Sequence, residues 1–219
     1  MAAPPTNLTA LRQLLSERFP QAVRAPASAL LTGIPCVDET VGGLPRHAVT
    51  ELVCSTPSCG GQLFVAQLLA ATRAHRLRVA LVDGTDSFDP GSCLADDLVH
   101  VIWVRCDHTD PALQVTDLLA RDANLGLVVL DLRHAPEAEL RRIPNRQWYL
   151  LQRAVEATDL ALVIVTPRAL VSSAQLRLEL TRAQGIATLE EGRLTLVSSM
   201  APTLQRQRLS TPSLGSAVA

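Results

Sequence analysis

Glu51-Leu-Val-Cys-Ser-Thr-Pro-Ser-Cys-Gly-Gly-Gln62 has the order of a P-loop, namely an apolar strand, a glycine-containing turn and the start of a helix. A working P-loop ends in Gly-Lys-Ser or Gly-Lys-Thr. Its backbone amides surround the phosphates, its lysine reaches the β and γ oxygens, and its hydroxyl binds magnesium. Here the ending is Gly60-Gly61-Gln62, and Ser55 stands at the first glycine position. The segment therefore predicts the backbone of a nucleotide-binding turn without its lysine.

No lysine elsewhere in the 219 residues can replace the missing one, because all 20 residues of the lysine and arginine total are arginine. The wide planar fork of arginine is a poor substitute for a slim point charge. Gln62 is a poor magnesium ligand. A retained scaffold turn is the favoured interpretation, although an anion could still bind to the helix N-terminal amides. The candidate remnant of a nucleotide site comprises Ser55, Ser58, Gly60, Gly61 and Gln62, and no cofactor is expected.

Composition excludes several classes of function. A hydrophobic fraction of 47% can form the core of one domain, and the net charge of -1 gives no overall basic field for binding nucleic acid. Aromatic residues make up only 3% of the chain, too few for a base-stacking platform. We expect neither a signal peptide nor a membrane span, and a cytoplasmic location.

The five cysteines are odd in number and never form a C-x-x-C pair, which argues against a disulfide framework and a zinc ribbon. We expect most of them to be buried as small hydrophobic residues. Acidic and histidine residues occur near Cys106 and Asp131, but no second cluster has ligand spacing, so no metal site is predicted. No hydrolase triad is supported either.

Short apolar runs separated by amphipathic segments predict buried parallel strands in a doubly wound sheet. Alternation in two later segments predicts antiparallel strands that close the sheet. The predicted parallel strands cover about 48–53, 79–82, 99–104, 127–131 and 160–166. The predicted helices cover about 63–75, 111–121 and 145–157. The predicted antiparallel strands cover 175–182 and 193–197. A helical arm (1–27), a core domain (28–202) and a disordered tail (203–219) are expected.

Several separated segments resemble RecA-like recombinases in their order along the chain. These are Leu31–Asp38 with Gly42–Arg46, Leu81–Pro90, Ala174–Leu180 and Leu196–Pro202. The resemblance covers about residues 28 to 202. It implies a RecA-like P-loop NTPase core.

The resemblance also marks the catalytic positions that this chain has lost. Asp131 matches the Walker B aspartate. Thr85 stands where the recombinases have a water-activating glutamate, and Thr166-Pro167 where they have a glutamine that senses the γ-phosphate. The resemblance therefore implies a pseudo-ATPase with no catalytic residues.

The DNA-facing loops of the recombinases correspond by position to residues 136–146 and 168–173. The second is too short to wrap a strand, so filament formation is not expected. The first loop, residues 136–146, and the residues just after it contain the candidate contacts to DNA or to a partner, namely Arg141, Arg142, Arg146 and Trp148. The alternatives are a solvated helix face for the arginines and core packing for Trp148.

Among RecA relatives, the chain is most similar to the ImuA family of inducible-mutagenesis accessory proteins. That resemblance implies a non-catalytic role in the SOS response and in translesion DNA synthesis. The implied partners are an inactive Y-family polymerase homologue and an error-prone replicative-type polymerase, with RecA as a further candidate, and the implied location is the nucleoid when DNA is damaged. The alternatives are a weak NTP-binding ATPase that regulates DNA repair and a cell-division inhibitor of the SulA type.

Overall fold

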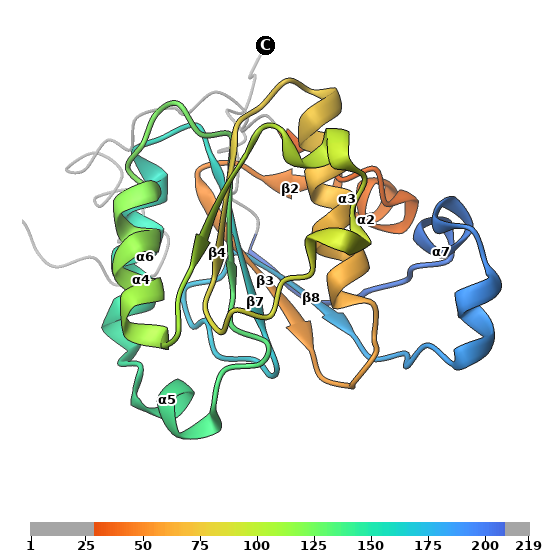
Figure 1. Ribbon diagram of the computed structural model, residues 1–219. Helices are drawn as coiled ribbons and strands as arrows, with labels where there is room; N and C mark the ends of the chain where they lie inside the picture. The colour runs from red at the N-terminus through yellow and green to blue at the C-terminus, as the bar shows by residue number, and fades with distance from the viewer. Residues whose placement is uncertain (1–28, 209–219) are drawn as a thin grey trace, which may run out of the picture.

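The computed structural model describes residues 29–208 (Figure 1). The predicted helical arm and residues 209–219 of the predicted tail lie outside this range. The predicted core boundary at residue 202 is wrong, because Thr203–Gln207 forms strand β9. This strand pairs with β8 (Leu176–Leu180), and that pairing keeps its polar residues in the fold.

A seven-stranded sheet in the order β5-β4-β6-β7-β3-β8-β9 forms the centre of the described chain. Six strands run parallel, and only β9 is antiparallel to its neighbour. Besides β8 and β9, the sheet contains β3 (Ala48–Cys54), β4 (Val79–Asp83), β5 (Val101–Arg105), β6 (Leu127–Asp131) and β7 (Ala161–Thr166). The predicted α/β fold with a mostly parallel sheet is confirmed.

Helices cover both faces of the sheet (Figure 1). Helices α4 (Thr109–Leu119) and α6 (Asn145–Glu156) pack on one face, and α3 (Gly61–Ala74) and α2 (Pro35–Val41) on the other. Short α5 (Glu137–Arg142) follows β6, and α7 (Arg193–Ser198) lies beside α3. The remaining elements of the described residues are small: β1 (Ala29–Leu30), β2 (Leu44–Pro45), η1 (Pro90–Ser92), η2 (Ala95–Leu98) and η3 (Ile186–Glu190).

Alternate residues of the strands divide the core into two clusters. On β7, Val163 belongs to the cluster under α3, whereas Ile164 belongs to the cluster under α4 and α6. This alternation follows from the pleat, which points successive side chains to opposite faces. Because both faces are covered, strands β4, β6 and β7 are apolar along their whole length except for the last residue.

Two details of the predicted sheet are wrong. Arg193–Ser198 is a helix and not an antiparallel strand. The third predicted parallel strand is not buried, because β5 is an edge strand on which Ile102 and Trp103 are exposed. The predicted antiparallel strand at 175–182 is β8, which is antiparallel to β9 but parallel to β3. Periodicity cannot distinguish an edge strand from a central one, because both are short apolar runs.

Candidate functional site

Residues 55–62, here called the 55–62 turn, connect the end of β3 to the first residues of α3. Two residues of this turn adopt a left-handed backbone, Ser58 with φ 57° and Gly60 with φ 91°. Glycine takes this conformation without a steric penalty, and Gly60 precedes the helix as its N-cap. The predicted strand, turn and helix N-terminus are therefore all present.

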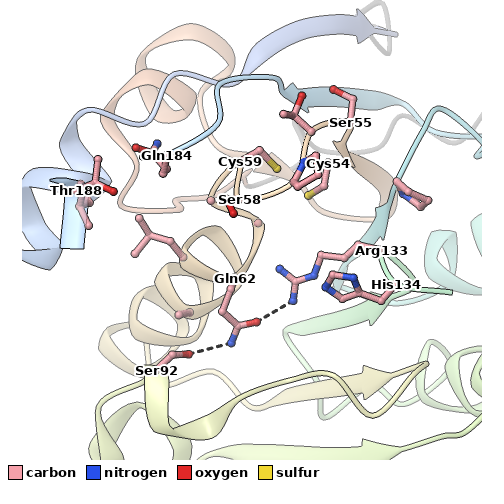
Figure 2. A pocket seen from close by; sticks show the side chains of 18 of the residues that line it. Cys54, Ser55, Ser58, Cys59, Gln62, Ser92, Arg133, His134, Gln184 and Thr188 are labelled. Carbon is pink, nitrogen blue, oxygen red and sulfur yellow. Dashed lines mark hydrogen bonds between the residues drawn. The ribbon is translucent and has the colours of Figure 1, made fainter. Parts of the chain in front are cut away.

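A cavity of about 880 Å³ opens beside the 55–62 turn (Figure 2). Its walls come from the turn, from the segment after β6 and from the C-terminal part of the described chain. The backbone N–H of Gln184 donates to the carbonyl oxygen of Ser58 at 2.9 Å, which holds this last wall against the turn. Ligand cavities in proteins commonly have this size.

Arg133 projects from the end of β6 toward the 55–62 turn and is the main cation of the cavity wall (Figure 2). Its Nη2 donates to Asp131 Oδ2 at 2.6 Å and to Gln62 Oε1 at 2.7 Å. Gln62 in turn donates from Nε2 to Ser92 Oγ at 3.0 Å. The guanidinium is therefore engaged by a carboxylate and an amide of its own chain.

Asp131 is 1% exposed, and both of its carboxylate oxygens accept hydrogen bonds from Arg133. Burial raises the pKa of Asp131, and the neighbouring guanidinium opposes that shift. The residue matched to the Walker B aspartate is therefore committed to an internal ion pair.

Gly61 is closely surrounded on the side where a Cβ would project. An added Cβ would lie 2.7 Å from Cys54 Sγ and 2.9 Å from Arg133 Nη1. Neither distance is compatible with van der Waals radii. Any side chain at position 61, lysine included, would have to displace one of these two groups.

A Gly61→Ala variant is therefore expected to lose about 1–3 kcal/mol of unfolding free energy, the usual cost of overpacking. Removing the sulfur in a Cys54→Ala, Gly61→Ala double variant should recover part of this loss. Urea unfolding monitored by circular dichroism measures both values.

Gly192→Ala is the matched control, because Gly192 has φ −66° and no atom within 4 Å of the added Cβ. Its unfolding free energy should change by less than about 0.5 kcal/mol. Equal losses in the two single variants would contradict the crowding of Gly61.

The structure brings most of the predicted remnant together. The five residues predicted on the 55–62 turn line the cavity, and Asp131 reaches them through Arg133. Ser55 is exposed, and its Oγ is 3.4 Å from the carbonyl oxygen of Leu180. Thr166 lies away from the cavity, because its hydroxyl donates to the buried Glu51.

Three residues of the site were missed in the sequence. Arg133 follows the matched aspartate by two positions, just past the end of β6, which is separated from β3 by β7 in the sheet. Cys54 and Cys59 lie at the ends of the turn. They were not predicted as site residues, because most cysteines were expected to be buried as small hydrophobic residues. Of the five cysteines, only Cys59 and Cys106 are buried, and all five are free.

The second group of predicted residues is divided by the structure. Trp148, a residue of α6, is 2% exposed and packs in the core cluster between α6 and the sheet, so its predicted role as a contact to DNA or a partner is wrong. The helical spacing of Trp148, Leu151 and Val155 places all three side chains on the buried face of α6. Arg141, Arg142 and Arg146 are exposed, and Arg141 pairs with Glu137.

Residues 29–208 contain neither a metal-binding cluster nor a membrane-spanning helix. No group of three or more histidine, cysteine, aspartate or glutamate side chains there could hold a metal ion. None of the described helices is long and apolar enough to cross a bilayer.

Comparison with known proteins finds RecA proteins. The chain is 32% identical to Protein RecA of Streptomyces ambofaciens over 123 residues, which are 53% of this chain and 33% of that protein. It is 31% identical to Protein RecA of Pseudarthrobacter chlorophenolicus over 159 residues, 64% of this chain and 44% of the relative. No protein-family model matches. The chain thus spans less than half the length of these relatives, and its fold is a RecA-like α/β core.

Proposed function

We propose that this chain is a non-catalytic, RecA-like accessory protein of the DNA damage response that acts in translesion synthesis through contacts with polymerase-type partners. The observation that carries the proposal is the Arg133–Asp131 ion pair beside Gly61. It uses the guanidinium nearest the 55–62 turn among residues 29–208 and the matched Walker B carboxylate in the same internal contact.

Transfer of a γ-phosphate requires cations aimed at the phosphate oxygens and a carboxylate that positions magnesium. Position 61 supplies no charge, and Gln62 bonds Arg133 and Ser92. An incoming triphosphate would have to break the buried ion pair before it gained these groups. The arrangement supports a scaffold role.

The partner surface that we propose is the outer face of α6. Tyr149 and Leu150 are 50% and 46% exposed there, between Arg146 and Arg153. Exposed tyrosine and arginine side chains are typical anchors of protein interfaces. Tyr149 thus takes the role predicted for Trp148. The partner classes are those implied by the resemblance to the ImuA family.

The proposal is tested by capture on the tagged full chain without nucleotide. Both implied polymerase-type partners should be retained, and ATP turnover should be absent. A Tyr149→Ala variant should lower retention at least about tenfold, the loss of one interface anchor. Leu118→Ala, at an exposed apolar residue of α4, is the matched control and should retain the partners.

Two outcomes would contradict this proposal. One is ATP hydrolysis at recombinase-like rates that an Asp131→Ala change abolishes. The other is retention of the tubulin-like division protein in place of the polymerases, which would indicate a SulA-type inhibitor.

A weak NTP-binding regulator is the second candidate function. It is favoured by the cavity of about 880 Å³ and by the guanidinium of Arg133 in its wall. Calorimetric titration with ATP and magnesium distinguishes the two. Heat of binding at micromolar nucleotide would favour the regulator, and its absence at millimolar nucleotide the scaffold.

A further inference from the structure

We propose that Cys54 and Cys59 are a redox-active pair, which a peroxide oxidises to an intramolecular disulfide across the 55–62 turn. This inference is independent of the proposed function, because it concerns the chemistry of the turn itself.

The two cysteines lie at the two ends of one short segment. Cys54 is the last residue of β3, and Cys59 directly precedes the N-cap of α3. Both line the cavity, where Figure 2 shows them next to each other. A small oxidant in the cavity can therefore reach both thiols, and a disulfide between them would span the 55–62 turn.

The surroundings of Cys59 stabilise its thiolate. The hydrogen bond from Cys54, and then hydrogen bonds from the backbone N–H groups of Gly61, Thr56 and Cys59 itself, lower the pKa of Cys59 to about 6, although burial opposes this. In a phosphate-binding turn the backbone amides point at an anion. Here amides of the same kind of turn point at a sulfur, so the internal anion is the Cys59 thiolate.

Cys54 is suited to the second step of the reaction. Its hydrogen bond to Cys59 and its burial raise the pKa of Cys54, so it stays protonated beside the thiolate. Gly61 provides the room for its sulfur, since a Cβ there would lie 2.7 Å from Cys54 Sγ. The glycine in the lysine position is thus explained by the thiol that it accommodates.

The reaction balances with one molecule of hydrogen peroxide. The Cys59 thiolate attacks one peroxide oxygen and the O–O bond breaks, which leaves a sulfenic acid. The departing hydroxide takes up the proton that the Cys59 thiol released when it ionised, and becomes the first water. The Cys54 sulfur then attacks the Cys59 sulfur, the S–O bond breaks, and the Cys54 proton leaves with the hydroxide as water. Two thiols and one peroxide give one disulfide and two waters. A dithiol reductant reverses the change.

Peptide mapping tests the proposal on the unaltered full chain. Trypsin cleaves after Arg46 and Arg73, so residues 47–73 form one peptide that contains Cys54 and Cys59 and no other cysteine. After brief exposure to hydrogen peroxide and blocking with iodoacetamide, this peptide should have lost two hydrogen atoms and gained no alkyl group. Treatment with dithiothreitol should restore two alkylation sites.

Single variants distinguish the roles of the two sulfurs. Cys54→Ser should leave a Cys59 sulfenic acid that dimedone traps, and Cys59→Ser should leave Cys54 at least about tenfold less oxidised. Cys93→Ser is the matched control and should form the disulfide as the natural chain does. Uptake of two alkyl groups after peroxide, or direct conversion of Cys59 to a sulfinic acid, would overturn the proposal.

The rate of alkylation against pH gives a second readout, which a merely structural pair would not show. Cys59 should reach its full rate by about pH 7.5, because its pKa is about 6. Burial raises the pKa of Cys93, so its rate should still rise about tenfold per pH unit there. A Cys59 rate that rises in parallel with that of Cys93 would contradict the stabilised thiolate.

Discussion

A Glu51→Ala variant should lose about 3–5 kcal/mol of unfolding free energy, the cost of leaving the partner of a buried ion pair uncompensated. Glu51 lies in the middle of β3 with 0% exposure. Its Oε2 accepts from Arg177 Nε at 2.5 Å. The side chain of Arg177 is only 19% exposed, so water could not fully replace the lost carboxylate.

The other oxygen of Glu51 holds the segment after β7. Oε1 accepts from the backbone N–H groups of Leu170 at 2.6 Å and Val171 at 3.0 Å, and from the hydroxyl of Thr166 at 3.1 Å. Alanine would leave these donors without their acceptor. Each buried donor left unpaired costs about 1–3 kcal/mol, so the loss should be visible even after local relaxation.

Urea unfolding at pH 7 measures the effect, with Glu137→Ala as the control. Glu137 also accepts from two arginines, Arg141 and Arg168, but it is exposed, and its loss should cost less than about 1 kcal/mol. Glu51→Gln keeps one carbonyl acceptor, so its loss of unfolding free energy should lie between those of Glu51→Ala and Glu137→Ala. An alanine variant at Glu51 as stable as the Glu137 control would show that burial adds nothing to this ion pair.

Arg133→Ala should be the second strongly destabilised variant, by about 3–5 kcal/mol at neutral pH. The change leaves Asp131 buried without its cation, and Gln62 without its donor. Arg121→Ala is the control, since Arg121 forms an exposed ion pair with Asp117 and should change the stability by less than about 1 kcal/mol.

The loss in Arg133→Ala should depend on pH. Burial raises the pKa of Asp131 and Arg133 lowers it, so removing Arg133 raises it further. A raised pKa means that the folded state binds the proton more tightly than the unfolded chain. The loss should therefore be smallest below about pH 4, where Asp131 is protonated in both states, and should grow as the pH rises.

An Asp131→Asn, Arg133→Ala double variant provides the internal check. Without the buried charge, its stability should exceed that of Arg133→Ala at neutral pH and should vary less with pH. A loss in Arg133→Ala that stays constant between pH 4 and 8 would contradict the role assigned to the ion pair. Urea unfolding across this range measures all three proteins.

The sequence was most informative where strands are buried on both faces. The apolar run Leu127–Asp131 gave strand β6 with its observed bounds, and the helix expected at 145–157 is α6. Segments with alternating residues were less reliable. Arg193–Ser198 alternates like a strand, but Leu196 and Val197 pack toward the cavity and the core from a short helix.

The candidate site could be predicted only as far as the backbone. The turn, its position and the absence of lysine were evident from residues 55–62. The reach of Arg133 across to Gln62 depends on how β6 and β3 are placed in one sheet, which periodicity does not specify. The turn between Cys54 and Cys59 contains Ser58 with a left-handed backbone, which residue type does not predict.

The strand order has a consequence for the synthesis of the chain. Among residues 29–208, β3 is the first long strand to be made, but its neighbours β7 and β8 both come from residues beyond 160. Until those residues are translated, β3 lacks the two strands that flank it in the sheet. The sheet can therefore assemble around β3 only after about 100 further residues have been made, and contacts of such long sequence separation favour slow folding.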